Sequence, residues 1–308
     1  LSLPKYLPGF DSITGLYELF KTEVEAGTKG EIKLDLVYNN GLGAPNDRLN
    51  MMRRGVIQMT DASDGNYASI YPDVQVLSIP YLFPSEQVAW KVLDGPFGQK
   101  IAEEIRQKTG IRIFGYWESG GYKHYSSNKP IHGPADMKGL KMRALGPVFA
   151  KTVEALVGSA TAINFGELYT SLKTGVVDGQ DNAIAVFSLV KLYEVQKYLT
   201  LSRHIYSMGM LAMNDAFYNG LTAEQKQVVQ AAAKKAIEFN RTRSRASEAE
   251  LLKQMEAKGL TVVQPTSAAM ADFAKATQQP VIDWLKTQVT TPALIDEAFA
   301  AVRQAEGK

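Results

Sequence analysis

The chain contains no cysteine among its 308 residues. This absence excludes thiol nucleophiles, cysteine-based zinc sites and disulfide bonds. It also suits an oxidising compartment, because no thiol can mispair while the chain folds. The sequence lacks a phosphate-binding loop and a dinucleotide fingerprint, and the 3 histidines have no second ligand at metal-binding spacing. We therefore expect neither a metal ion nor a cofactor. The histidines are His124, His132 and His204.

Long hydrophobic runs and runs of one charge are also missing. No apolar stretch approaches the roughly 20 residues that a membrane-spanning helix needs. The 34 basic and 32 acidic side chains are well mixed, give a formal net charge of +2, and form no basic run of five. This mixture argues against nucleic acid as a partner. The first residue is Leu1 rather than methionine, and we expect either that a secretory signal was cleaved or that the sequence was trimmed.

The length and the order of patterns indicate two α/β domains. A chain of 308 residues exceeds one ordinary core. Strands alternate with helices, which predicts sheets covered on both faces. Gly120 and Gly121 permit backbone angles that other residues avoid, so we expect the first crossing between domains there. One lobe should contain residues 1–120 and 208–247, and the other should contain residues 121–207 and 248–308.

An unbroken helical pattern extends from about residue 222 to residue 258. Thr222 and Gln225 form a capping-box arrangement at its start. At about 1.5 Å per residue the helix would exceed roughly 50 Å. A core of this size cannot bury it along its length, so we expect it to bend or to bridge both lobes. Elsewhere we expect strands at 31–38, 74–79, 111–117, 122–127 and 140–145, and a single helix over 186–198.

Two motifs between Asp136 and Asn182 contain side chains suited to binding a carboxylate. The first, Asp-Met-Lys-Gly-Leu-Lys-Met-Arg, ends at Arg143, and the second, Asp-Gly-Gln-Asp-Asn, ends at Asn182. An arginine offers paired planar donors that match a carboxylate in bidentate fashion. An asparagine can donate and accept, which suits a hydroxy or keto acid. Taken alone, however, Arg143 could be an exposed strand residue and Asn182 a turn residue.

These motifs and their order resemble those of the extracytoplasmic receptors of TRAP (tripartite ATP-independent periplasmic) transporters. The resemblance covers nearly the whole chain. It implies a two-lobed clamshell of the periplasmic-binding-protein type, with the long helix spanning both lobes. Such a protein does no chemistry but captures a small organic acid in the periplasm and delivers it to the membrane permease subunits. We expect a monomer that does not itself span the membrane. Further matching segments are residues 79–83, 129–131 and 192–198.

The resemblance implies roles for four residues of the second lobe. Arg143 would bind the ligand's carboxylate, Asn182 would contact the carboxylate or the neighbouring substituent, and Phe165 would lie against the same end. Lys123 occupies the place where the sialic-acid branch of the family has a second arginine. A lysine binds as a point charge without the fork geometry of arginine. This departure argues against sialic acid as the ligand.

The other end of the ligand would meet polar loops of the first lobe. Ser63, Asp64 and Asn66 follow a short strand and would be natural partners of hydroxyl groups, and an acidic side chain there would repel a second carboxylate. Asn40 lies in another polar loop with a weaker claim. Trp117 suits a pocket wall or the core equally well.

The favoured ligand is a hydroxylated monocarboxylate, such as a sugar acid or a short hydroxy acid. Trp117, Tyr67 and Tyr122 leave an aromatic or keto acid open, and Lys123 could supply the second cation that a C4-dicarboxylate needs. A different class of protein, an enzyme on a two-domain α/β frame, would need a nucleophile–base pair or a metal cluster, and the sequence offers neither. A receptor for an ATP-driven importer would share the clamshell but not the two motifs.

Overall fold

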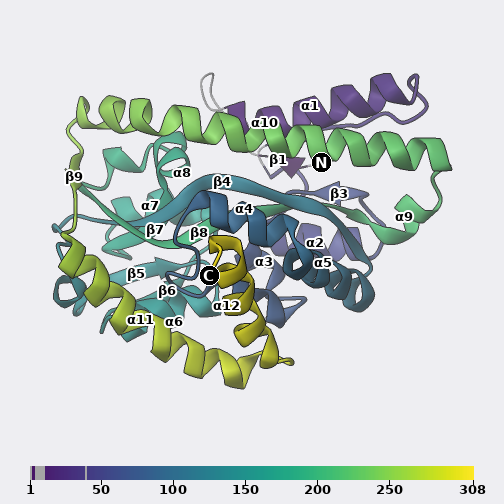
Figure 1. Ribbon diagram of the computed structural model, residues 1–308. Helices are drawn as coiled ribbons and strands as arrows, with labels where there is room; N and C mark the ends of the chain where they lie inside the picture. The colour runs from purple at the N-terminus through teal and green to yellow at the C-terminus, as the bar shows by residue number, and fades with distance from the viewer. Residues whose placement is uncertain (1, 4–10, 39) are drawn as a thin grey trace. The chain divides into compact units, whose positions relative to one another are not determined.

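The computed structural model describes residues 2–3, 11–38 and 40–308. Its strands alternate with helices (Figure 1), so the predicted α/β fold class is confirmed. The chain divides into two compact units, which are Leu1–Tyr71, Trp90–Ser119 and Met208–Ala246 (unit 1), and Pro72–Ala89, Gly120–Ser207 and Ser247–Lys308 (unit 2). Four described elements have residues in both units: α4 (Glu86–Asp94), β4 (Ile111–Ser127), β8 (Tyr198–Asn214) and α10 (Ala223–Glu256). Residues 72–89 belong to unit 2, although they fall inside the range that we expected in the first lobe.

Unit 1 is built on β3, which pairs antiparallel with β8 through Met59 and Met213. The residues after β3 also lie alongside β8, because an isolated bridge joins Ser63 to Gly209. A second pair, β1 with β2, is parallel. The remaining elements of unit 1 are β1 (Ser2–Leu3), α1 (Asp11–Gly27), β2 (Val37–Tyr38), α2 (Pro45–Arg53), β3 (Met59–Thr60), α3 (Asp64–Tyr67), α5 (Pro96–Thr109) and α9 (Asp215–Asn219).

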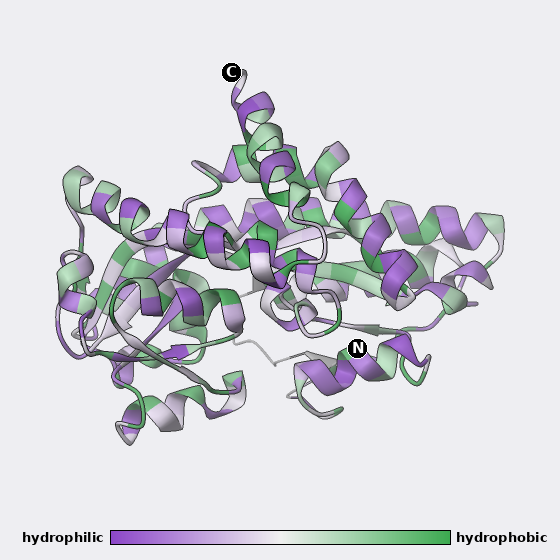
Figure 2. Ribbon diagram, turned by 90° about the horizontal axis from the view of Figure 1, so that it is seen from below, coloured by the Kyte–Doolittle hydropathy of each residue, from purple (hydrophilic) through white to green (hydrophobic). Residues whose placement is uncertain are grey.

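The core of unit 1 forms where α1 packs on α10. Leu16, Phe20 and Val24 recur at helical spacing in α1 and are fully or almost fully buried. They contact Val229 and Ala233 of α10, and Figure 1 shows the two helices side by side. The helices in Figure 2 carry both hydrophilic and hydrophobic residues, as expected of helices with one buried and one solvated face.

Unit 2 contains a sheet with the strand order β8-β4-β7-β5-β6, and β9 pairs with β8. β5 is parallel to β6 and to β7, whereas β7 is antiparallel to β4. A core of Tyr125, Met142, Val153 and Phe273 joins this sheet to α6 and α11. The elements of unit 2 are η1 (Pro72–Ser78), η2 (Pro134–Met137), β5 (Lys141–Ala144), α6 (Pro147–Ala155), β6 (Ser159–Ala162), η3 (Phe165–Glu167), α7 (Leu168–Lys173), β7 (Gly179–Ala183), α8 (Ile184–Leu189), η4 (Leu192–Glu194), β9 (Thr261–Val263), α11 (Ser267–Gln288) and α12 (Ala293–Glu306); α4 (Glu86–Asp94) starts in unit 2 and ends in unit 1.

The long helix was predicted well. α10 extends from Ala223 to Glu256, close to the expected range of 222–258. Thr222 Oγ1 accepts a hydrogen bond from the Gln225 amide, and Gln225 Oε1 accepts one from the Thr222 amide. This reciprocal pair is the predicted capping box. Residues of α10 up to Ala246 belong to unit 1, and the later residues belong to unit 2.

Four local predictions were wrong. Residues 74–78, where a strand was expected over 74–79, lie in the 3₁₀ helix η1, because a short buried apolar run has no periodicity that separates helix from strand. Residues 186–198 are not one helix, since α8 ends at Leu189, Lys191 has a φ of 55°, and Tyr198 already begins β8. The strands expected at 111–117 and 122–127 are one strand, β4, with Gly120 and Gly121 inside it. In the segment 31–38 only Val37–Tyr38 is a strand.

Candidate functional site

Arg143 lies near the carboxyl end of β5, where the sequence predicted a strand. Its side chain is 2 % exposed. The Nε donates a hydrogen bond to the carbonyl oxygen of Ile163 at 3.0 Å, whereas the buried Nη2 has no hydrogen-bond partner among the described residues. An unpaired buried donor is costly, so this Nη2 group is a candidate donor for a ligand. Burial lowers the pKa of Arg143, and the charge of Asp181 opposes this effect.

Lys123 and Asp181 form an ion pair on neighbouring strands. The register of β4 against β7 pairs Lys123 with Ala183 and Tyr125 with Asp181, so both charged side chains start from one face. Lys123 Nζ lies 3.7 Å from Asp181 Oδ2 and 4.7 Å from the ring centre of Phe149. Asp181 Oδ1 is buried and has no partner among the described residues. Asp181 therefore compensates the charge of Lys123 inside the protein.

His204 completes this buried network. Its Nε2 lies 3.3 Å from Asp181 Oδ2, its Nδ1 lies 2.8 Å from Ser202 Oγ, and its ring stacks on Tyr125. Burial lowers the pKa of His204, although Asp181 opposes this effect, so the ring is neutral at pH 7. Burial alone would raise the pKa of Asp181, but Lys123, the hydrogen bond with His204, and Arg143 hold it well below its ordinary value. Lys123 and Arg143 are two cations, and Asp181 is the one anion between them. These three side chains together therefore have one uncompensated positive charge.

Asn182 and Phe165 lie close to Arg143 along the strands. The parallel register of β5 and β7 pairs Met142 with Gly179, which places Arg143 on the same face as Asn182. Lys123 starts from the opposite face, so the register does not group it with Asn182. Phe165 is half-buried at the start of η3, two residues after the carbonyl that holds Arg143. Arg143, Asn182 and Phe165 thus gather at the carboxyl ends of β5, β6 and β7, where parallel sheets bind ligands.

The predicted residues of unit 1 occupy two loops and one strand. Ser63 precedes α3, and Asn66 Oδ1 accepts hydrogen bonds from the Ser63 amide and hydroxyl. Asp64 is buried at 1 % exposure, whereas Asn40 is exposed and has a φ of 54°. Through these bonds Ser63 and Asn66 cap the start of α3. The role of this segment toward a ligand stays a prediction.

Trp117 lies in β4 and is 5 % exposed. Its indole ring packs on Gly209, where a Cβ atom would come within 2.1 Å of a ring carbon. The ring also meets Tyr17 edge to face, with 6.2 Å between ring centres, and its Nε1 has no partner among the described residues. Gly209 is also bridged to Ser63, so Trp117 and Ser63 have Gly209 as a common neighbour. Trp117 serves the core of unit 1, and its role as a pocket wall stays a prediction.

Three buried polar residues were missed by the sequence reasoning. Asp181 belongs to the second motif but was not singled out, and His204 was considered only as a metal ligand and set aside. Arg48 is 1 % exposed and makes hydrogen bonds to both unit 1 loops. A sequence signal existed for Arg48, because it shares a helical face with Met52, four residues later, which is buried.

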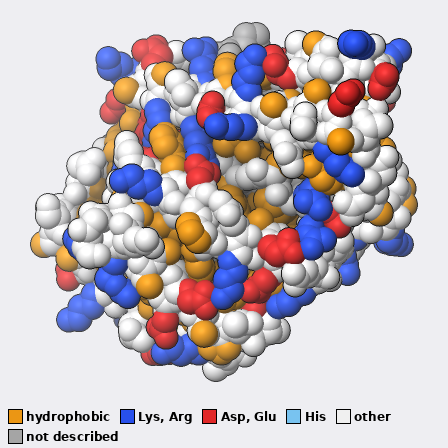
Figure 3. Space-filling view, turned by 45° about the vertical axis from the view of Figure 1, so that its right-hand side comes forward, with side chains coloured by type: hydrophobic (Ala, Val, Ile, Leu, Met, Phe, Trp, Pro, Cys, Tyr) orange, Lys and Arg blue, Asp and Glu red, His pale blue; other side chains and the backbone are white. Residues whose placement is uncertain are grey.

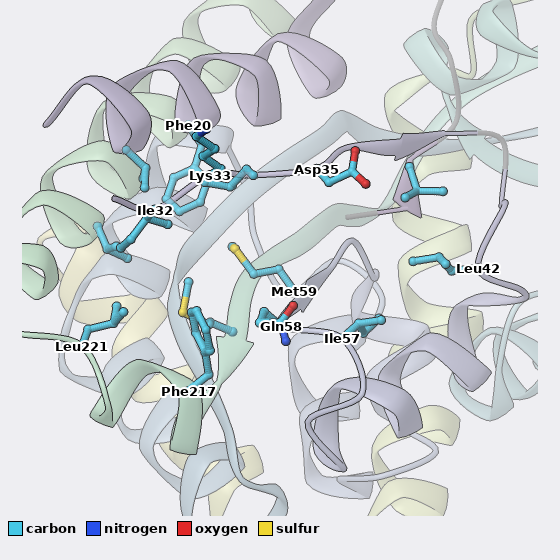
Figure 4. A pocket seen from close by; sticks show the side chains of 15 residues that line it. Phe20, Ile32, Lys33, Asp35, Leu42, Ile57, Gln58, Met59, Phe217 and Leu221 are labelled. Carbon is cyan, nitrogen blue, oxygen red and sulfur yellow. The ribbon is translucent and has the colours of Figure 1, made fainter. Parts of the chain in front are cut away.

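Figure 4 shows a separate apolar pocket in unit 1. It has a volume of about 450 Å³ and lies between α1, the segment at 32–37 and β3. Phe20, Ile32 and Met59 are among its lining residues, and Lys33 and Asp35 are its charged ones. None of the predicted binding residues lines it, so it is not part of the candidate site.

The described part of the chain has no group of three histidine, aspartate or glutamate residues that could hold a metal ion. None of its described helices is long and apolar enough to cross a membrane. On the face shown in Figure 3, basic and acidic side chains are interspersed rather than gathered in one patch.

Known proteins are similar to this chain in sequence. A family model described as bacterial extracellular solute-binding protein, family 7 (DctP), matches residues 8–287. The 2,3-diketo-L-gulonate-binding periplasmic protein YiaO of Escherichia coli (strain K12) is 31% identical over 245 residues, which cover 79% of this chain and 74% of that protein.

Two solved structures superimpose on nearly the whole chain. A TRAP periplasmic solute-binding protein from Sulfitobacter sp. NAS-14.1 with bound β-D-galacturonate has a TM-score of 0.90 at 28% identity, covering 98% of this chain and 99% of that one. The sugar acid binding protein DctPAm from Advenella mimigardefordensis, in complex with galactonate, has a TM-score of 0.92 at 27% identity, covering 99% of this chain and 98% of that one.

Proposed function

The chain belongs to the bacterial extracellular solute-binding proteins of family 7, and we propose that it captures a hydroxylated monocarboxylate, in particular a sugar acid, for a TRAP transporter. Members of this family are receptors that bind a substrate and do not convert it, so the protein is not an enzyme. The receptor would work in the periplasm and release its ligand to the membrane permease subunits.

The unpaired Nη2 group of Arg143 is the observation that carries this proposal. Its Nε already donates to Ile163, and its Nη2 is buried without a partner among the described residues. The edge left for a bidentate contact is the one between Nη1 and Nη2. A carboxylate at this edge would satisfy the free donor and neutralise the remaining positive charge. The ion pair would form in a site with little water, where a fully hydrogen-bonded pair is strongest.

The charge balance around Lys123 favours a monocarboxylate over a C4-dicarboxylate. A second carboxylate would need a second free cation, but Asp181 lies 3.7 Å from Lys123 Nζ. The pKa of Asp181 lies well below its ordinary value, even though burial opposes its ionisation, because Lys123 and His204 stabilise the anion. The charge of Lys123 is therefore balanced by Asp181, and Lys123 needs no anionic group from the ligand.

Two observations support hydroxyl groups on the ligand. The relatives described above bind 2,3-diketo-L-gulonate, galacturonate and galactonate, which are all six-carbon sugar acids. The residues proposed for the far end are polar, namely Ser63, Asp64, Asn66 and Asn40. Near the carboxylate, Asn182 can donate or accept and Phe165 would cover the flat carboxylate group. An affinity from micromolar to tens of nanomolar, roughly −8 to −10 kcal/mol, would permit both capture and release.

A thermal-shift screen of ligand-free protein tests the proposal. The probes are galactonate, galacturonate and succinate, with galactitol as the neutral counterpart of galactonate. We expect an upward shift of the unfolding temperature with at least one sugar acid, a smaller shift with succinate, and none with galactitol. Equal shifts with galactitol and galactonate would show that the carboxylate is not recognised, and the absence of a shift with all acids would refute the proposed ligand class.

A further inference from the structure

Arg48 is a buried cation in unit 1 whose donors are all engaged. It lies in α2 at 1 % exposure. Its Nε donates to Thr60 Oγ1 at 2.9 Å. Its Nη1 donates to Asn40 Oδ1 at 2.9 Å and to the Gly43 carbonyl at 2.6 Å. Its Nη2 donates to Asp61 Oδ1 at 2.9 Å, with a longer contact of 3.4 Å to the Asp61 carbonyl.

These acceptors come from two loops that the sequence separates. Asn40 and Gly43 belong to the loop before α2. Thr60 ends β3, and Asp61 begins the loop at 61–66, which includes the first turn of α3. A second residue of α2 supports the same loop, because Asn46 Oδ1 accepts from Asn66 Nδ2 at 3.3 Å. The start of α2 thus holds both polar loops in one arrangement.

The need for stability alone does not account for an arginine at this position. Burial raises the pKa of Asp61 to about 6, against the influence of Arg48, so its carboxylate is ionised at neutral pH and balances the guanidinium. Replacing a buried ion pair with apolar residues is often neutral or stabilising. Met52, one turn away, is also buried, so the surroundings accept an apolar side chain. What arginine adds is a rigid planar set of donors that fixes the positions of its acceptors.

We propose that Arg48 is a positioning residue that makes the receptor selective for long hydroxylated acids. It holds Asn40 and the loop at 61–66 in the arrangement that meets the hydroxyl end of the ligand. This inference rests on the proposed function, because it takes these two loops to be the far wall of the site. Arg48 itself reaches no ligand, since its donors are occupied by the chain.

The test compares two acids in calorimetry. Galactonate is long enough to reach the far wall, whereas glycerate, measured by displacement, has only a carboxylate and a short hydroxylated stem. In Arg48→Met we expect the affinity for galactonate to fall about tenfold, which is about 1.4 kcal/mol, and the affinity for glycerate to change less than twofold. Arg48→Lys should not restore selectivity, because one ammonium group cannot hold acceptors from both loops.

Arg53→Met is the matched control, because Arg53 lies on the same helix but is exposed. This variant should keep the affinities of the unmodified protein for both acids. An equal loss of both affinities in Arg48→Met, or no loss of either, would overturn the inference, since a merely structural role would not discriminate between the ligands. Restoration of selectivity by Arg48→Lys would also contradict it.

A milder variant protects the test if Arg48→Met fails to fold. Thr60→Val removes the acceptor of the Arg48 Nε with little change of shape. It should lower the affinity for galactonate about threefold relative to glycerate, and an unchanged ratio would overturn the inference.

If the unmodified protein bound neither acid, the proposed function would fail first, and the inference would fall with it. Binding by the unmodified protein with an unchanged ratio in the variants would instead refute only the role of Arg48.

Discussion

Lys123 Nζ lies 3.7 Å from Asp181 Oδ2, and both side chains are buried inside unit 2. Because of this pair, the two cations of the candidate site, Lys123 and Arg143, have different roles. Lys123 is balanced by the chain, whereas Arg143 has a buried Nη2 that no described residue accepts from. We therefore propose that the site binds one external anion, supplied by a single carboxylate.

Arg143→Met should abolish the binding of organic acids without harming the fold. The variant loses the only guanidinium that we assign to the ligand, so we expect the affinity for a bound acid to fall at least about a hundredfold. Stability should stay equal or increase, because a buried charge with an unpaired donor is removed. Calorimetry and thermal unfolding measure the two effects. The control is Lys141→Met, an exposed position on the same strand, which should bind normally; a normal affinity in Arg143→Met would exclude the clamp role.

Lys123→Met should destabilise the protein strongly. Asp181 would remain buried without its closest cation, and breaking a buried pair from one side costs about 3–5 kcal/mol. Urea unfolding measures this loss. The double variant Lys123→Met/Asp181→Asn should recover most of it, because no uncompensated charge remains. If the double variant were as unstable as the sum of the single variants, the two residues would not be coupled.

His204 should contribute a loss of stability on mild acidification. Burial holds the folded-state pKa of His204 below the ordinary value, although Asp181 opposes this effect. Below about pH 6.5 the unfolded chain binds a proton that the folded protein does not. The contribution of His204 to the free energy of unfolding therefore falls with decreasing pH, by at most about 1.4 kcal/mol per pH unit. Asp61, whose pKa burial raises to about 6, contributes in the opposite direction below about pH 6. The low pKa of Asp181 adds a further loss only below about pH 4.

Substitution of the histidines isolates this contribution. On going from pH 7.5 to pH 5, His204→Gln should lose less unfolding free energy than the unmodified protein. The exposed His132 provides the control, and His132→Gln should leave the pH dependence unchanged. Identical pH dependence in His204→Gln and in the unmodified protein would rule out His204 as the responsible group.

Gly209→Ala should disturb the environment of Trp117. The new Cβ would lie within 2.1 Å of a ring carbon of the indole, so the ring has to move, at a cost of about 1–3 kcal/mol. We expect a lower unfolding free energy together with a shift of the tryptophan fluorescence maximum. Gly133→Ala is the control, because a Cβ there meets no atom within 4 Å. Unchanged fluorescence in Gly209→Ala would mean that the packing is looser than described.

Local patterns made part of the fold predictable. The helix α10 has apolar residues at helical spacing and a capping box in Thr222 and Gln225, and both signals are read within a few residues. The strand β5, which places Arg143, was also predicted close to its observed bounds. By contrast, the last five residues of β4 pair with residues 52 to 60 positions later in β7, and no local signal indicates that pairing.

The buried polar pairs were the least predictable part of the candidate site. Lys123 meets Asp181 only because the β4–β7 register aligns Tyr125 with Asp181. A shift by one residue would turn Asp181 to the other face. Arg48 gathers acceptors from both sides of α2, which requires the folded loops to be known. Sequence motifs thus identified the ligand-facing candidates, whereas the charges that balance and position them emerged from the three-dimensional structure.

A crystal structure with bound galactonate tests the central claim most directly. We predict that the carboxylate oxygens lie within hydrogen-bond distance, about 3 Å, of Nη1 and Nη2 of Arg143, while Lys123 keeps its contact with Asp181. A carboxylate bound by Lys123, or bound elsewhere with the Nη2 of Arg143 still unpaired, would contradict the account.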